Sequence, residues 1–342
     1  MEPYGTHDFH DFHKIKLGRL VRGIAMELIP SPSQAPKENV LFAIGNTPLV
    51  KLNKLTTGLN ANVYVKLEFF NPTGSYKDRM ALAMIEGAER EGLLRHGDTV
   101  VEYTGGSTGS SLAFVCAVKG YKLKIVTSDA FSEEKINTMK AFGAELIIVP
   151  SEGGKTTPDL VPKMMKTAEE IGKAPRTYRT NQFYNKHMLK GYNGLGTEIL
   201  NQLDGRVDAF VASFGTAGCS MGVAEVLKAV RKEIGVFLVE PAESPVVSKG
   251  ITGTHDIEGI GAGFVPPLLR KDLYDEILTV STEEANEMAR RLAREEGIFA
   301  GSSTGANVIA SLRVAKKLGA GKNIVTVAVD SGTKYISTEV FR

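Results

Sequence analysis

Short apolar runs and helix-length segments alternate along the chain from residue 61 onward. The apolar runs are rich in strand-forming residues and predict strands at 63–67, 99–103, 123–127, 146–149, 209–213, 236–240 and 324–329. The intervening segments predict helices at 78–91, 110–119, 133–142, 194–202, 221–234, 282–296 and 304–318. Because strands that alternate with helices form βαβ units, this order predicts an α/β fold with parallel sheets.

Turn residues mark the ends of the first three predicted helices. Gly92, Gly120 and Gly143 follow them and are expected to close them. Ser132 is expected to cap the third helix, since a serine hydroxyl can accept a hydrogen bond from a free backbone N–H there. The helix boundaries are therefore expected to lie close to these residues.

The strands and helices fall into two series, which predicts two α/β domains with a cleft between them. The smaller, mobile domain is expected at 77–183 and the larger at 41–76 together with 184–342. The glycines around residues 104–109 suggest that the smaller domain closes over a substrate. Residues 1–40 are poorly patterned and are expected to form an arm.

The arm contains three evenly spaced histidines, His7, His10 and His13. Structural zinc sites usually include cysteine, and the polar arm has none. We therefore interpret the spacing as incidental and predict no metal site.

Composition and charge exclude several classes of protein. The 342 residues carry 41 Lys and Arg against 39 Asp and Glu, and no long basic run indicates nucleic-acid binding. No apolar run is long enough to span a bilayer, and residues 23–27 are too short for a signal sequence. Two cysteines, Cys116 and Cys219, are too few for a disulfide framework, so a cytoplasmic location is expected.

Lys77 ends a turn-rich segment and starts a predicted helix. A helix N-terminus disfavours a cation, which helps to hold an amine in its reactive neutral or imine form. Lys77 is thus placed for covalent catalysis, although an isolated lysine in a first turn is more often an ordinary surface residue.

Three other glycine-rich or hydroxyl-rich segments each lead into a predicted helix. Backbone N–H groups and hydroxyls in 104–109 make a concavity that suits a carboxylate. The glycines of 215–222 allow a phosphate to approach the backbone at the start of a helix. This segment has neither a Walker lysine nor a Gly-x-Gly-x-x-Gly run, so nucleoside triphosphates and dinucleotides are not expected. The third segment, 297–305, is a hydroxyl-rich turn.

These four segments, in this order, resemble the cysteine synthase and cystathionine β-synthase family of fold type II pyridoxal-phosphate enzymes. The likeness extends from Ile-Gly-Asn-Thr-Pro-Leu at 44–49 through Val-Glu-Pro at 239–241 and Gly-Ile-Gly-Ala-Gly-Phe at 259–264 to Asp-Ser-Gly at 330–332. The resemblance implies the tryptophan synthase β-like fold, in which two open twisted-sheet, three-layer domains hold the active site in the cleft between them.

The resemblance also implies residue roles. Lys77 would form the Schiff base with pyridoxal 5′-phosphate, and Ser303 would face the pyridine nitrogen. The cofactor phosphate would be bound by Gly215, Thr216, Ala217, Gly218 and Cys219. The substrate would be bound by Thr104, Gly105, Gly106, Ser107, Thr108 and Gln182, with Ser107 also contacting the cofactor. No metal ion is implied.

The implied reaction is β-replacement on a serine-derived amino acid through an aminoacrylate. Cysteine synthase activity, which joins O-acetylserine or O-phosphoserine to sulfide, is the main expectation. The expected partners are a small amino-acid substrate and sulfide or another small nucleophile, with a homodimer as the assembly. A serine beside the pyridine nitrogen cannot protonate it as an acid would, which favours prompt β-elimination. Cystathionine β-synthase, cysteine desulfhydrase or lyase, diaminopropionate-type synthase and serine or threonine dehydratase remain alternatives on the same scaffold.

Three departures from the family pattern keep another class open, a catalytically silent pyridoxal-phosphate-binding regulatory subunit. Ser107 stands where the family usually has asparagine. Ala217 and Cys219 replace a glycine and a threonine of the phosphate loop. Residues 184–190 replace an Asn-Pro-Ala-Asn-Pro run beside the expected mouth of the site, so the leaving group or nucleophile can also differ.

Overall fold

The computed structural model describes residues 36–154 and 159–342. The helices and strands of the described residues lie within the unit Val40–Arg342. The predicted arm up to residue 35, with His7, His10 and His13, lies outside the described residues.

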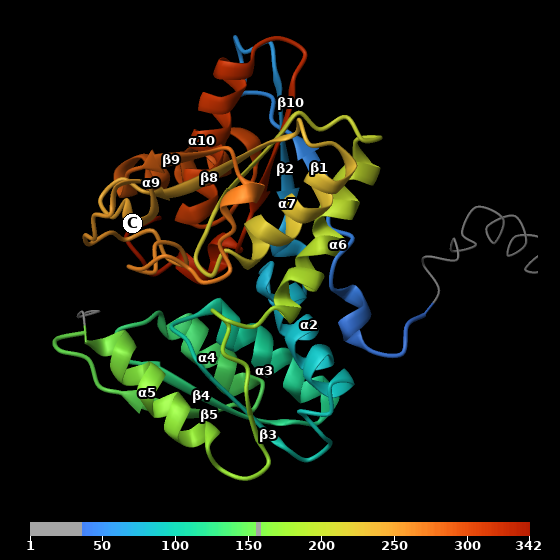
Figure 1. Cartoon of the computed structure of the whole chain (residues 1–342). Coiled ribbons are helices and arrows are strands. Elements are labelled where there is room, and N and C mark those ends of the chain that lie inside the picture. The colour runs from blue at the N-terminus through green and yellow to red at the C-terminus, as the bar shows by residue number, and fades with distance from the viewer. Residues whose placement is uncertain (1–35, 155–158) are drawn as a thin grey trace, which may run out of the picture. The chain divides into compact units, whose positions relative to one another are not determined.

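One sheet has six strands in the order β1-β2-β10-β7-β8-β9. Every neighbouring pair is parallel except β1 with β2. Figure 1 shows β2 and β10, from opposite ends of the chain, paired in the middle of this region. The strands are β1 (Leu49–Lys51), β2 (Asn62–Leu67), β7 (Ala209–Ser213), β8 (Gly235–Pro241), β9 (Glu276–Val280) and β10 (Asn323–Ala328).

Helices cover both faces of the six-stranded sheet. They are α6 (His187–Gln202), α7 (Gly218–Val230), α9 (Thr282–Arg291) and α10 (Ser302–Leu318). Because side chains alternate along a strand, Phe210 and Ala212 of β7 pack in the core cluster that includes residues of α6 and α7. Ala209 and Val211 pack in a second cluster with residues of α9 and α10. The sheet is therefore the middle of three layers.

The second sheet has four parallel strands in the order β5-β4-β3-β6. Its strands are β3 (Thr99–Tyr103), β4 (Lys122–Ser128), β5 (Glu145–Val149) and β6 (Thr177–Arg179), and its helices are α2 (Lys77–Arg90), α3 (Ser107–Lys119), α4 (Glu133–Ala141) and α5 (Leu160–Gly172). Val100 of β3 packs in a cluster with residues of α3, whereas Val101 packs with residues of α5. Helices therefore cover both faces of this sheet as well. The predicted α/β fold, with two sheets that each form the middle of three layers, is confirmed.

Short helices complete the described elements. They are η2 (Val40–Ala43), η3 (Glu68–Phe70), α8 (Val246–Lys249), η4 (Lys271–Leu273), the π-helix η5 (Leu292–Glu296) and η6 (Gly332–Tyr335). All seven predicted strands are present, each within one residue of its predicted ends. The cap predictions are also confirmed at Ser132, which accepts from Lys135 N, and at Gly120, which has a left-handed conformation.

Several predicted helix boundaries were wrong. The helices predicted from residues 110, 194, 221 and 304 begin earlier, at Ser107, His187, Gly218 and Ser302. Before the starts predicted at 110, 221 and 304, the residues are Gly, Ser and Thr apart from Cys219. They read as loop in the sequence but fit a first helical turn, where backbone N–H groups need no intrahelical acceptor. This reason does not apply to 187–193, which contains a single glycine and neither Ser nor Thr. The helix predicted to reach residue 234 ends at Val230, and the one predicted over 282–296 changes to a π-helix at Leu292.

The carboxyl ends of three strands lead directly into the segments that sequence analysis singled out. β3 is followed by residues 104–106 and then α3, and β7 is followed by 214–217 and then α7. β10 ends two residues before Asp330. Ligands of open parallel sheets bind at this edge of the strands, so the fold places the candidate residues where a ligand is expected.

Candidate active site

Lys77 is the first residue of α2, and its side chain is half-buried. Its Nζ donates to the hydroxyl of Tyr76 at 3.0 Å and lies 4.3 Å from the centre of the Tyr76 ring. Burial lowers the pKa of the Lys77 amine, and the nearby Asp330 and Cys219 oppose this change. Burial therefore favours the neutral amine, which is the nucleophilic form.

Residues 214–217 connect β7 to α7, and Gly218 and Cys219 begin the helix, so 215–219 supplies backbone donors at a helix start. Ala217 is the N-cap of α7 and offers no side-chain hydrogen bond to the first turn. Gly218 N donates to Thr216 Oγ1 at 3.3 Å, whereas the next backbone N–H groups of this turn have no side-chain acceptor among the described residues and can serve a ligand. Tyr76, Tyr192 and residues 213–220 line one hollow. Since Tyr76 also contacts the Lys77 amine, the lysine lies next to the predicted phosphate loop.

Position 215 requires glycine because the backbone of Gly259 lies too close to leave room for a side chain. A Cβ placed on Gly215 would lie 2.5 Å from the carbonyl oxygen of Gly259. Nearby, Gly261 N donates to Phe214 O at 3.3 Å. The Gly-rich segment 259–264, which contributed to the family resemblance, thus packs directly against the phosphate loop.

The structure brings together two of the predicted substrate-binding residues. Thr108 Oγ1 donates to Gln182 Oε1 at 2.9 Å, and Gln182 Nε2 donates to Tyr103 O at 3.1 Å. The backbone N–H of Gln182 also donates to Glu102 at 2.9 Å. Within the loop itself, Thr104 Oγ1 accepts from Gly106 N at 3.1 Å.

Glu102 is fully buried beside the substrate loop. Burial raises the pKa of its carboxyl, although hydrogen bonds from Thr180 and from the backbone N–H groups of Gln182 and Tyr103 act in the opposite direction. Its carboxylate holds the segment around Gln182 against the end of β3. Sequence analysis did not identify this supporting role.

The hydroxyl of Ser107 is engaged by two groups that were not predicted as site residues. It donates to Asp330 Oδ2 at 2.5 Å and accepts from Lys334 Nζ at 3.4 Å. Tyr335 OH donates to the same carboxylate oxygen at 3.1 Å. The Asp-Ser-Gly motif at 330–332 could have drawn attention to Asp330, but no sequence signal marked Lys334.

A third lysine lies close to the substrate loop. Lys135 of α4 is buried, its Nζ is 4.4 Å from the centre of the Tyr335 ring, and it forms an ion pair with Glu258. Its Cδ would lie 3.0 Å from a Cβ on Gly106. A side chain at position 106 would therefore require Lys135 to shift by a few tenths of an ångström.

Ser303 lies at the start of α10 and is buried. Its neighbour Ser302 has a buried hydroxyl without a hydrogen-bond partner among the described residues, and Thr304 Oγ1 accepts from Val329 N at 3.0 Å. The start of α10 thus presents buried serine hydroxyls, one of which lacks a partner in the described chain.

Four charged side chains form a buried cluster under α2. Arg79 donates to both oxygens of Glu68 and to both oxygens of Glu198, at 2.7–2.8 Å. Lys66 Nζ lies 2.8 Å from Glu198 Oε2. Burial opposes ionisation of Glu198, but Arg79 and Lys66 outweigh it and lower its pKa to about 2. The cluster ties the helix that carries Lys77 to β2, η3 and α6.

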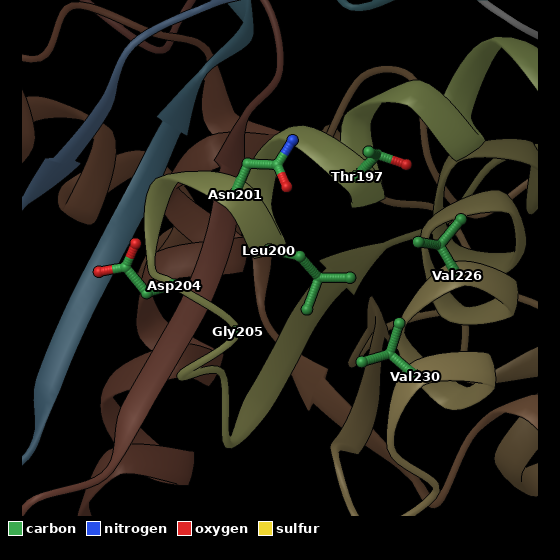
Figure 2. A pocket seen from close by; sticks show the side chains of 7 residues that line it. All are labelled: Thr197, Leu200, Asn201, Asp204, Gly205, Val226 and Val230. Carbon is green, nitrogen blue, oxygen red and sulfur yellow. The ribbon is translucent and has the colours of Figure 1, made fainter.

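Figure 2 shows a larger hollow of about 500 Å³ elsewhere on the protein. It is lined by Thr197, Leu200, Asn201, Asp204, Gly205, Val226 and Val230. The lining comes from the ends of α6 and α7 and contains no lysine or histidine, and none of the predicted site residues. The narrower hollow beside Tyr76, although smaller, has the chemistry that the predicted site requires.

A family model described as pyridoxal-phosphate dependent enzyme matches residues 40–330. The chain belongs to this family. The match covers both sheets and all the candidate site residues. The chain is therefore a pyridoxal-phosphate-dependent enzyme of the transferase and lyase type.

Named relatives narrow the position within the family. Cysteine synthases of Staphylococcus aureus strains Mu50 and N315 are 45% identical over 311 residues, which is 90% of this chain and 98% of each relative. The identification of the chain with the cysteine synthase and cystathionine β-synthase family is thereby confirmed.

Solved structures agree with the family assignment. A cysteine synthase from Entamoeba histolytica has a TM-score of 0.85 at 38% identity, covering 91% of this chain and 93% of its own. A hydrogen sulfide-producing enzyme from Fusobacterium nucleatum has a TM-score of 0.84 at 41% identity, covering 89% and 100%. An O-ureido-L-serine synthase has a TM-score of 0.83 at 36% identity, covering 90% and 95%. The fold is that of the type II pyridoxal-phosphate enzymes.

The residues present fit pyridoxal 5′-phosphate as the cofactor. A lysine with a lowered pKa suits the aldehyde, uncapped N–H groups at the start of α7 suit the phosphate, and an unpartnered buried hydroxyl, that of Ser302, lies at the start of α10.

In residues 36–154 and 159–342, no group of three or more His, Cys, Asp or Glu side chains is arranged to hold a metal ion. No described helix combines the length and apolarity needed to span a membrane.

Proposed function

We propose that this enzyme is a cysteine synthase, which replaces the β-substituent of O-acetylserine or O-phosphoserine with sulfide. The observation that carries the proposal is the half-buried Lys77 amine next to the 215–219 loop, in a chain 45% identical to cysteine synthases. Tyr76 contacts both features, so an aldehyde joined to Lys77 can also present its phosphate to the start of α7.

The proposed binding roles follow from the arrangement of donors. The N–H groups of 215–219 would hold the cofactor phosphate. The loop 104–108 with Gln182 would hold the substrate carboxylate, and the Thr108–Gln182 hydrogen bond would keep these donors together. Ser303 would face the pyridine nitrogen, where a hydroxyl supplies a hydrogen bond without transferring a full proton.

Pyridoxal phosphate, when bound, withdraws electrons from the α-carbon of an amino acid, so that a β-substituent can leave. Lys77 would take the Cα proton at its Nζ once the substrate amine has replaced it. Burial lowers the pKa of that amine and so favours the neutral form, which can accept a proton. Gln182 and Thr108 would orient the substrate so that Cα faces Lys77.

A substrate panel tests this proposal. O-acetylserine, O-phosphoserine, serine and cysteine are each combined with sulfide, homocysteine or a small amine, and the products are identified by mass. We expect cysteine from O-acetylserine or O-phosphoserine with sulfide, and no product with Lys77→Ala. A preference for homocysteine or an amine would instead indicate a cystathionine-forming or diaminopropionate-type enzyme. Release of sulfide from cysteine as the main reaction would indicate a desulfhydrase.

The silent regulatory subunit is the alternative from another class. It predicts cofactor binding without turnover of any member of the panel. Retention of Lys77 favours the enzyme, because the amine that would bond the cofactor is also the group that would take the Cα proton.

We further propose a division into a smaller, mobile domain, 77–183, and a larger one, 41–76 with 184–342. The division agrees with the strands of the two sheets, since β3 to β6 come from the first range and the others from the second. A homodimer in the cytoplasm is proposed from the family resemblance. Light scattering of the purified protein, and a comparison of free and substrate-bound structures, test the assembly and the domain motion.

A further inference from the structure

The carboxylate of Asp330 lies where three segments of the chain meet. Ser75 donates to its Oδ1, and Ser107 and Tyr335 donate to its Oδ2, at 2.5 and 3.1 Å respectively. Only 5% of Asp330 is exposed. A buried carboxylate that accepts hydrogen bonds from three side chains fixes the positions of its partners.

One of these partners, Ser75, also contacts the backbone of Lys77. Ser75 Oγ, which donates to Asp330, also accepts from the backbone N–H of Lys77 at 3.1 Å. Tyr76, which lies between Ser75 and Lys77 in the sequence, donates its backbone N–H to Val329 O at 3.0 Å. The turn that carries Lys77 is thereby fixed to the end of β10.

The other partner leads to the substrate loop. Ser107 starts α3 and stands where the family usually has asparagine. Its hydroxyl donates to Asp330 and accepts from Lys334 Nζ at 3.4 Å. The short serine side chain holds the loop backbone within one hydrogen bond of the carboxylate, which a longer side chain would keep further away.

We propose that Asp330 is a positioning residue for the reaction. Paired with Ser107 and Ser75, it sets the distance between the loop that binds the substrate carboxylate and the turn that carries Lys77. The proposal rests on the proposed function, because it assigns these two segments to the substrate and the cofactor. It also assigns a specific role to Ser107, which stands where the family usually has asparagine.

A first test measures steady-state kinetics for Ser107→Ala and Asp330→Asn, with Ser110→Ala as the matched control. Ser110 lies on the same helix, is buried, and has a hydroxyl without a partner among the described residues. We expect KM for the amino acid to rise roughly ten- to a hundredfold in the first two variants, the loss expected for a hydrogen bond to a charged group, with a smaller change in kcat. Ser110→Ala should behave as the wild type.

The double variant shows whether Ser107 and Asp330 act together or whether each substitution damages the site independently. If Ser107 and Asp330 act as one unit, Ser107→Ala combined with Asp330→Asn raises KM no more than the stronger single variant does. Multiplicative effects, or an unchanged KM in Ser107→Ala, would overturn the proposal. Thermal unfolding of each protein shows whether a buried substitution has damaged the fold, and Ser107→Ala is the milder of the two.

A second readout does not depend on sulfide chemistry. Lys77 is surrounded by the charges of Asp330, Lys334 and Lys135 and by the Cys219 thiol, and Asp330 stabilises its protonated form. The rate at which the apoprotein takes up pyridoxal phosphate depends on the fraction of Lys77 whose amine is neutral. Asp330→Asn removes a negative charge, so the pH midpoint of uptake should shift downward, whereas Ser110→Ala should leave it unchanged.

These measurements distinguish the two possible failures. If the wild type takes up cofactor but no cysteine forms, the proposed function fails, and the positioning role is then decided by amino-acid binding, which Ser107→Ala and Asp330→Asn should weaken and Ser110→Ala should not. If the wild type makes cysteine but Asp330→Asn shifts neither the midpoint nor KM, the positioning role is wrong.

Discussion

At the scale of single residues, Ala217 shows how this chain tolerates a departure from its family. Its φ of 64° is in the left-handed region, which costs an alanine about 1–2 kcal/mol. Glycine, the usual family residue, adopts this conformation without that cost. The loop nevertheless keeps its form, because Gly215 packs on Gly259 and the donors offered to a phosphate are backbone N–H groups.

Ala217→Gly should therefore stabilise the apoprotein by about 1 kcal/mol, since the relief of strain exceeds the added freedom of the unfolded chain. Urea unfolding followed by circular dichroism measures the change. Ala229→Gly, at an exposed position of the same helix, is the matched control and should destabilise by up to about 1 kcal/mol. Equal destabilisation by both substitutions would contradict the strain at Ala217.

At the scale of elements, α2 is held by charge as well as by apolar packing. Arg79 binds both Glu68 and Glu198, and Lys66 completes a cluster with two positive and two negative charges. Such a cluster adds little stability compared with apolar residues, but loss of one partner leaves a buried charge unpaired. The cluster thus fixes the position of the helix that begins at Lys77.

Glu198→Gln should lower the free energy of unfolding at pH 7 by roughly 3–5 kcal/mol, because Lys66 loses its carboxylate partner. The pKa of Glu198 in the folded protein, about 2, lies below its ordinary 4.5, so its contribution is complete above about pH 5 and is lost as the pH falls toward 2. Urea unfolding from pH 7 to pH 3 should show the difference from the wild type shrinking. The exposed Glu233→Gln is the control, and a difference independent of pH would contradict the account.

The strands could be predicted from sequence because buried parallel strands are continuous apolar runs with clear ends. Helix starts could not, because the hydroxyl-rich and glycine-rich residues of a ligand loop continue into the first helical turn, as at Ser107 and Gly218. Helix α5 was not predicted, since Pro162 in its first turn reads as a helix breaker, although proline is tolerated there. Strands β1 and β6 have only three residues each and leave little pattern.

At the scale of the whole molecule, the two sheets share one apolar core. Leu112 of α3 and Ile125 of β4 belong to the same cluster as Tyr192 of α6 and Val223 of α7. Figure 1 shows α2 between α3 and α6, and α2 packs against both. The lysine-bearing helix is thus the link between the two sheets, and a shift of either sheet changes the surroundings of Lys77.

The candidate site could be predicted only where the chain carries a local motif. Lys77, the 104–108 loop and the 215–219 loop each stand in a recognisable segment. The position of Asp330 beside these segments could not be predicted because its partners Ser75 and Ser107 are 255 and 223 residues away, and their contact arises only from the fold. The same reason applies to Lys135, whose partner Glu258 is 123 residues away.

The most direct test of the account is the attachment of pyridoxal phosphate to Lys77. The purified enzyme is supplied with the cofactor, reduced with borohydride, digested and analysed by mass spectrometry, beside Lys77→Ala treated in the same way. We predict a pyridoxyl phosphate mass on the peptide that contains Lys77, and none at a comparable level on any other lysine of either protein. Labelling of another lysine in the wild type, or no labelled peptide at all, would contradict the account.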